Sequence, residues 1–149
     1  MDLQALLPDV RIQDYWPNVR DLAIAYALAL LIGLNREQED RSAGVRTFPL
    51  VAIAACGFVQ ASESVLAGSG EGKGAALQGI ITGIGFIGGG AIFKGGSEVH
   101  GTATAAALWA TGAIGFAAGV EEYDVAVVVC LFTVVTLWVL GRLKSKQDN

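Results

Sequence analysis

The chain has 149 residues, of which 53% are hydrophobic and only 16% are charged. Its mean hydropathy of +0.53 is too high for an ordinary soluble domain of this size, because such a domain needs a polar surface. The net charge of −4 argues against a nucleic-acid binder, since such proteins present a basic face. The length allows one domain, and bundled membrane spans would use nearly all of it.

The start of the chain has no basic region and no small-residue cleavage site after an early apolar run, so we expect no cleaved signal peptide. We divide the chain into an N-terminal periplasmic or interfacial segment (1–18), a transmembrane domain (19–142) and a short cytoplasmic tail (143–149). The first span is then expected to serve as its own insertion signal.

Five apolar windows approach the roughly 20 residues that a transmembrane helix needs. The first, Leu22–Asn35, is the shortest; Asn18 is a candidate cap for it, and Arg20 and Asp21 are expected in the headgroup layer. Asp124 is expected where the last helix begins, because a carboxylate is favourable at a helix N-terminus. A buried soluble helix can give one such window, but five predict an all-α membrane protein. The other four windows are Thr47–Ser62, Gly74–Phe93, Gly101–Val120 and Val125–Gly141.

The distribution of lysine and arginine predicts the orientation of these spans, since cytoplasmic loops carry an excess of them. Five spans place seven such residues on one side and three on the other. The N-terminus is therefore expected outside and the C-terminus inside. The residues expected on the cytoplasmic side are Arg36, Arg41, Arg46, Lys94, Arg142, Lys144 and Lys146.

Glycine and alanine are concentrated in the third and fourth windows. Helices in lipid associate by close packing, and Gly79–Gly83, Gly85–Gly89 and Gly115–Gly119 have the small-xxx-small spacing that permits it. We predict that these two helices form the bundle centre or a dimer interface, and that the first and fifth face lipid. Alternatively, Gly88–Gly90 unwinds its helix and exposes carbonyls to an ion, with Thr82, Thr104 and Thr111 lining a polar path. The residues predicted for packing or such a path are Gly83, Gly85, Gly88, Gly89, Gly90, Thr104, Trp109 and Gly112.

Other candidate sites are weak. Gly83–Gly88 matches GxGxxG, but it lies inside an apolar span with no preceding strand, so no dinucleotide site is expected. Cys56 and Cys130 are expected to pack as small hydrophobes. His100, the only histidine, has no neighbour at ligand spacing. We therefore predict no metal site, no cofactor and no enzymatic activity.

Two polar loops are predicted to meet at the cytoplasmic face. One follows the first span and ends at Thr47, and the other runs from Lys94 to Thr102. Charges that are partly buried at helix ends must be paired, so Arg36, Glu37 and Arg46 are candidates for a structural or gating ion pair. The alternative is an ordinary solvated loop. The predicted cluster comprises Asn35, Arg36, Glu37, Arg46, Thr47, Lys94 and Glu98.

Four ordered segments, Gly33–Glu37, Ala43–Thr47, Gly83–Ile92 and Gly101–Trp109, closely resemble the motifs of the MgtC/SapB membrane family. The resemblance extends from about Val19 to Arg142. It implies a bacterial inner-membrane protein of a family associated with growth in low magnesium and survival inside macrophages. Such proteins are thought to act on other membrane proteins, including the F-type ATP synthase and magnesium or potassium transport systems, rather than to pump magnesium.

Several positions depart from the family pattern. Members commonly carry Glu where Asn35 stands, and virulence-associated members tend to have Asn and Cys at the positions of Ala103 and Ala110. Many members also append a cytoplasmic ACT-like domain, whereas this sequence stops soon after Lys146. These departures from the family pattern suggest a shorter, SapB-like branch and weigh against the macrophage role.

The sequence thus predicts a non-enzymatic inner-membrane protein, linked to magnesium homeostasis or stress adaptation, that acts through contacts with other membrane proteins. We expect a homodimer through the glycine-rich helices. The competing hypothesis is a small channel or transporter for Mg²⁺ or another small solute. A third hypothesis is a structural membrane component with no dedicated ligand.

Overall fold

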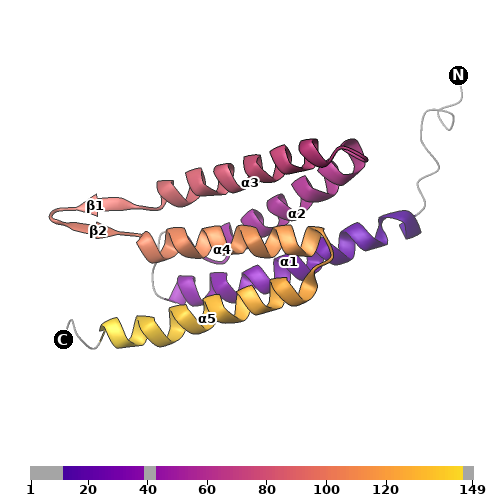
Figure 1. Ribbon diagram of the computed structural model, residues 1–149. Coiled ribbons are helices and arrows are strands. Elements are labelled where there is room, and N and C mark those ends of the chain that lie inside the picture. Colours follow the sequence, from indigo (N-terminus) through magenta and orange to yellow (C-terminus); the bar gives the residue numbers. More distant parts are fainter. Residues whose placement is uncertain (1–11, 39–42, 146–149) are drawn as a thin grey trace, which may run out of the picture.

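The computed structural model describes residues 12–38 and 43–145, which form an antiparallel bundle of helices (Figure 1). Successive helices run in opposite directions. The connections 43–46 and 93–101 lie at one end of the bundle, here called the hairpin end, and 66–69 and 120–122 lie at the other, the far end. In chain order, the elements are α1 (Ile12–Gln38), α2 (Thr47–Val65), α3 (Gly70–Gly90), β1 (Phe93–Gly95), β2 (Glu98–His100), α4 (Thr102–Gly119) and α5 (Tyr123–Ser145).

Two of the described helices, α1 and α5, are long and apolar enough to cross a bilayer. Their windows Tyr15–Gln38 and Tyr123–Gly141 have mean hydropathies of 1.4 and 2.3. α2 holds a shorter apolar stretch, Thr47–Glu63. At 1.5 Å per residue the five helices are roughly 27–40 Å long, and a hydrocarbon core is about 30 Å thick. The chain is thus an all-helical bundle consistent with a membrane protein, and the number of spans stays a prediction.

Each predicted window corresponds to one helix, with differences at the ends. α2 begins at Thr47, and Asp124 lies in the first turn of α5 as expected. The predicted boundary at Asn18 is wrong, because α1 begins at Ile12 and continues through Pro17. A proline removes one backbone N–H, a small loss near the start of a 27-residue helix. Most of the predicted N-terminal segment, with Arg41 and Lys146, lies outside the described residues.

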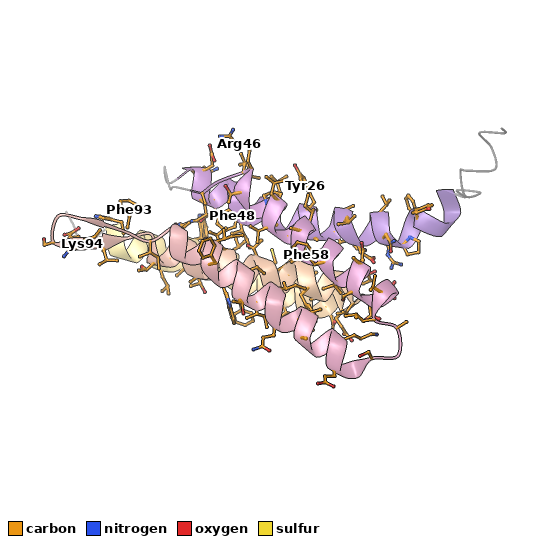
Figure 2. The ribbon with its side chains drawn as sticks, turned by 90° about the horizontal axis from the view of Figure 1, so that it is seen from above. Tyr26, Arg46, Phe48, Phe58, Phe93 and Lys94 are labelled. Atoms are coloured by element: carbon orange, nitrogen blue, oxygen red, sulfur yellow. The ribbon has the colours of Figure 1, made fainter. Side chains whose placement is uncertain are left out.

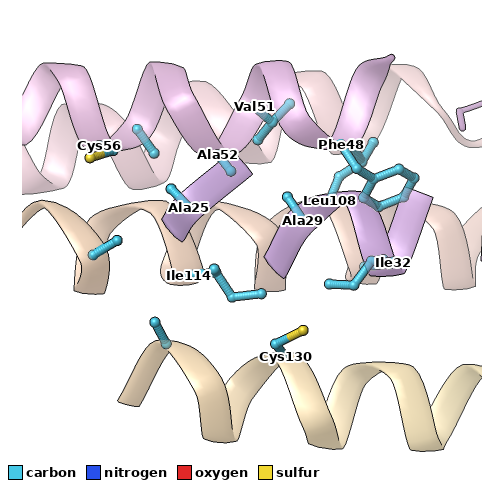
Figure 3. Close-up of a cluster of buried hydrophobic side chains, with 14 of the residues drawn as sticks. Ala25, Ala29, Ile32, Phe48, Val51, Ala52, Cys56, Leu108, Ile114 and Cys130 are labelled. Carbon is cyan, nitrogen blue, oxygen red and sulfur yellow. The ribbon is translucent and has the colours of Figure 1, made fainter. Parts of the chain in front are cut away.

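α4 is the central helix and packs against the other four. α3 lies at one edge, against α4 and α2, and α5 lies at the other, against α4 and α1 (Figure 1). The core includes the large side chains of Ile32, Phe48 and Leu108, each at most 1% exposed (Figure 3).

α1 buries one stripe, to which Ala25 and Ala29 belong, and leaves large apolar side chains such as Tyr26 and Leu31 exposed on its other side. Most large apolar side chains of α5 are exposed as well. That the first and fifth helices face lipid stays a prediction.

The glycines of α4 account for its central position. A Cβ on Gly115 would lie 2.2 Å from the carbonyl oxygen of Ala52, and one on Gly112 would lie 2.1 Å from Cδ1 of Ile84. α2 and α3 therefore approach α4 more closely than any larger residue would allow. The exposed glycines of α3 differ, because an added Cβ would meet no atom within 4 Å at Gly79, Gly83, Gly85, Gly89 or Gly90. Within one chain α3 is not central, and its role as a dimer interface stays a prediction.

A β-hairpin stands where a simple loop was expected after the third window. β1 and β2 pair antiparallel with Phe93 opposite His100 and Gly95 opposite Glu98. Gly96, the first of the two turn residues, has φ +66°, which suits the tightest hairpin turns. The Phe93 and His100 rings stack at 5.4 Å, and the hairpin projects beyond the helices (Figure 2). Strands of three residues are too short to show an alternating pattern in the sequence.

Candidate functional site

The first two sequence motifs form a single structural unit at the hairpin end. A Cβ on Gly33 would lie 3.1 Å from the Cα of Val45, and one on Gly44 would lie 1.7 Å from Oε2 of Glu37. The same Glu37 oxygen accepts the N–H of Val45 at 3.2 Å. The end of α1 is thus held against the segment that leads into α2, with a glycine on each surface to make room.

Three further residues of the predicted cluster belong to this unit. Arg36 is buried, and Oδ1 of Asn35 lies 3.4 Å from its Nη2. Thr47 starts α2, and its N–H donates to the Gly44 carbonyl at 3.0 Å. The Arg46 side chain is exposed and points away from the bundle (Figure 2). The neighbouring Glu39, Asp40 and Arg41 lie outside the described residues.

The remaining two residues of the cluster lie on the hairpin. Lys94 and Glu98 are exposed, and Lys94 projects at some distance from Arg46 (Figure 2). A Glu98 oxygen lies 3.9 Å from Nε2 of His100 on the same strand. The two polar loops therefore share one end of the bundle, but the Phe93–His100 and Glu98–His100 contacts lie within the hairpin itself.

The residues predicted for a polar path do not share one. Thr104 and Thr111 are buried in α4, and the Thr111 hydroxyl donates to the Ala107 carbonyl at 2.8 Å. Thr82 is exposed on α3 and donates to the Gln78 carbonyl at 2.8 Å. The Thr82 and Thr111 hydroxyls are satisfied within their own helices, which is the ordinary behaviour of a threonine inside a helix.

The alternative that Gly88–Gly90 unwinds its helix does not hold, and the packing that was the first prediction does hold at Gly88. α3 is helical through Gly90, and the N–H of Ala91 closes the last turn onto the Gly88 carbonyl at 3.0 Å. Gly88 packs on α4, where its Cβ would lie 3.2 Å from the carbonyl oxygen of Ala105. The three glycines therefore end a helix at the hairpin end of the bundle, instead of breaking one in its middle.

The sequence analysis missed a polar cluster at the far end, here called the Asp21 node. Asp21 is 3% exposed, so its carboxylate is enclosed by the helices. Its Oδ1 accepts Nε of Arg20 at 3.0 Å and the Tyr123 hydroxyl at 2.6 Å, and its Oδ2 accepts Nε2 of Gln60 at 3.2 Å. A buried carboxylate needs such partners. The sequence spacing could have indicated this burial, because Asp21, Ala25 and Ala29 follow each other at four-residue intervals and so lie on one face of the helix.

Glu121 is the remaining member of the Asp21 node. Its backbone is left-handed, with φ +64°. Its N–H donates to Ala118 at 3.1 Å, and the N–H of Glu122 donates to Ala117 at 2.9 Å. These two bonds define a Schellman ending of α4, in which the left-handed position usually holds glycine. The Glu121 carboxylate pairs with Arg20, whose guanidinium also lies 5.2 Å from the centre of the Tyr123 ring. The strained residue thus links the α4–α5 turn to α1.

Two apolar grooves flank α3 on the outside of the bundle. The larger, about 560 Å³, lies between α2 and α3, and its lining includes Phe58, Gly83 and Phe86. The smaller, about 260 Å³, lies between α3 and α4, with Trp109 and Gly112 in its lining. Grooves of this kind in a membrane bundle accept lipid chains or the side chains of another helix.

Comparison with known proteins identifies the family of this bundle. Residues 22–146 match the sequence profile of the MgtC family. The chain belongs to the MgtC family. It is 42% identical over 113 residues to Protein MgtC of Brucella abortus (strain 2308), which covers 76% of this chain and 47% of the relative. It is 37% identical over 108 residues to Protein MgtC of Salmonella typhimurium (strain 14028s), which covers 72% and 46%.

The chain therefore spans about half the length of the MgtC relatives that it matches. No solved structure matches it. The motif unit at the hairpin end and the α4 glycines all lie within the region that matches the MgtC family, and Asp21 lies one residue before it.

Proposed function

We propose that this MgtC-family chain is a multi-pass protein of the bacterial inner membrane with five spans. α1 and α5 have the length and apolarity of spans. α2 and α4 run antiparallel to them, and α3 lies at the edge of the bundle, antiparallel to α2 and α4 (Figure 1). Arg36, Arg46 and Lys94 are at the hairpin end, so we assign that end to the cytoplasm. The far end then faces outward.

Cysteine labelling tests this topology. In a background that carries Cys56→Ala and Cys130→Ala, a membrane-impermeant maleimide applied to intact cells should label Glu122→Cys and leave Ser97→Cys unlabelled. Permeabilised cells should label both. The reverse pattern would overturn the orientation, and labelling of both sites in intact cells would show that α4 does not cross the membrane and would overturn the five-span count.

We further propose that the protein is non-enzymatic, is linked to magnesium homeostasis or stress adaptation, and acts by binding other membrane proteins. The link to magnesium rests on the family. The binding role rests on one observation, the apolar groove between α2 and α3. Its rim carries Phe58 and Phe86, which are 63% and 85% exposed, beside a floor that includes Gly83. Large apolar side chains around a small-residue floor suit a transmembrane helix of a partner.

The polar groups favour binding over conduction. Mg²⁺ prefers several carboxylate oxygens and waters. Asp21, the buried carboxylate among the described residues, already accepts bonds from Arg20, Gln60 and Tyr123. The positive charge of Arg20 would oppose a divalent cation there.

Two measurements test the proposal. A photocrosslinking amino acid at Phe58 should capture a membrane protein of the native host grown in low magnesium, and the same group at Leu131, on the exposed face of α5, should not. Equal capture at both positions, or none, would count against the groove. Purified protein in liposomes should admit no more Mg²⁺ than protein-free liposomes; measurable flux would overturn the non-transport role.

A further inference from the structure

α3 presents a second face, on the side away from its buried residues Ile84 and Gly88. Five exposed residues on that side are spaced alternately three and four positions apart, which is the pattern of helices that pair side by side. We call this stripe the α3 seam. It comprises Ala75, Gln78, Thr82, Gly85 and Gly89.

The seam is open to close approach by another helix. A Cβ on Gly85 or Gly89 would meet no atom within 4 Å. On α4, by contrast, Gly112 and Gly115 are already covered by α3 and α2. The small residues therefore leave the α3 backbone accessible along the seam, and no described element of this chain covers it.

Gln78 gives the seam a side-chain amide that needs a hydrogen-bond partner. It lies eight residues into α3, about 12 Å along the axis, which is hydrocarbon depth for a spanning helix. Its main-chain carbonyl accepts the Thr82 hydroxyl, but no group in the described part of the chain bonds to its side-chain amide. An amide without a partner in hydrocarbon is costly. Gln78 therefore favours a partner from outside the chain.

We propose that the α3 seam pairs with the α3 seam of a second copy of this chain. All copies insert in one orientation, so a two-fold axis along the membrane normal sets the two α3 helices parallel, with each seam residue near its equivalent. The partial charges of an amide are self-complementary: one Gln78 oxygen accepts from the NH₂ of the other. A purely apolar helix would leave both amides unsatisfied.

The ends of the seam are compatible with this pairing. Glu71 continues the seam one heptad earlier, in the first turn of α3. Two such carboxylates repel each other, but in the aqueous layer salt screens the repulsion. The inference rests on the five-span topology proposed above, and it is independent of the groove between α2 and α3.

Disulfide crosslinking in native membranes tests the seam. In the background that lacks Cys56 and Cys130, Thr82→Cys and Gly85→Cys should form crosslinked dimers on oxidation. Gly83→Cys and Ile87→Cys, on the opposite side of the same helix, should not. Equal crosslinking at all four positions, or none at Thr82 and Gly85, would overturn the proposal. The maleimide pattern in the same background shows separately whether the topology holds.

A second measurement uses the unmodified protein. Single-molecule photobleaching in lipid bilayers should show dimers that dissociate on dilution. Gln78→Leu should weaken dimerisation by about 3- to 20-fold, the range of a buried interhelical hydrogen bond, and Gln78→Asn should retain most of it. A wild-type chain that stays monomeric, or a Gln78→Leu variant that dimerises as tightly as wild type, would overturn the pairing.

Discussion

The hydroxyl of Tyr123 donates a 2.6 Å hydrogen bond to Oδ1 of Asp21, 102 positions earlier in the chain. The bond joins the start of α5 to α1, and Gln60 of α2 bonds to the other oxygen of the same carboxylate. Because Asp21 is 3% exposed, its charge depends on these donors and on Arg20. One buried carboxylate thus ties three helices together at the far end.

Loss of the Asp21 node should destabilise the bundle. Tyr123→Phe should lower the free energy of unfolding by about 1 to 2 kcal/mol, the cost of a hydrogen bond to a charged group. Asp21→Ala should cost about 3 to 5 kcal/mol, because it leaves several donors without an acceptor. Thermal unfolding in detergent measures both. Tyr26→Phe, at a 46% exposed position on α1 (Figure 2), is the control and should change stability little. Equal effects of the two tyrosine variants would refute the node.

Replacement of glycine by alanine should destabilise the protein at Gly115 on α4 but not at Gly83 on α3. Gly115→Ala places a methyl group 2.2 Å from the Ala52 carbonyl oxygen, so α2 and α4 must separate at a cost of about 1 to 3 kcal/mol. Gly83→Ala meets no atom within 4 Å and should be neutral or stabilising by up to about 1 kcal/mol, because alanine favours helix. Paired unfolding curves decide this; a destabilising Gly83→Ala would mean that the α3 surface is packed more closely than described.

Glu37 and Gly44 should be energetically coupled. Gly44→Ala forces the Glu37 carboxylate away from the Val45 N–H, since the new Cβ would lie 1.7 Å from Oε2. We expect each of Gly44→Ala and Glu37→Ala to cost about 1 kcal/mol, and the double variant to cost less than the sum, because the clash disappears with the carboxylate. A double-mutant cycle measured by thermal unfolding gives the coupling. Strict additivity would show that the two residues do not meet.

Because the backbone at Glu121 is left-handed, Glu121→Gly and Glu121→Ala should differ in their free energy of unfolding. Glu121→Gly removes the strain of φ +64° along with the carboxylate, whereas Glu121→Ala removes the carboxylate and keeps the strain. The glycine variant should therefore be more stable than the alanine variant by about 1 kcal/mol. Both lose the pair with Arg20, so the comparison isolates the backbone. If the alanine variant were equally stable, the Schellman ending would be absent.

The positions of the helices followed from the sequence because apolar windows and helix starts are local properties. Thr47 begins α2, and the fourth window matches α4 within a residue at each end. The start of α1 was mispredicted, because Pro17 suggested a helix boundary, whereas the helix continues through this proline. The hairpin did not follow either, because its strands have three residues each.

The candidate sites depended on contacts that no local pattern contains. Gly79–Gly83 and Gly115–Gly119 have the same spacing, yet only the second pair is covered by another helix. From the sequence alone, Asp21 looked like a polar anchor at the membrane surface. Only the fold shows that Gln60 and Tyr123 donate hydrogen bonds to its carboxylate.

By itself, the sequence determined an all-helical chain of the MgtC family, the helix windows and the motifs Gly33–Glu37 and Ala43–Thr47. These follow from hydropathy and residue order along the chain. Only the tertiary structure decided that α4 is central, that α3 keeps an uncovered glycine face, and that Asp21 is buried. The reason is physical: composition and spacing show that a face can pack or a charge must be paired, whereas the partner is set by which helices lie side by side in the bundle.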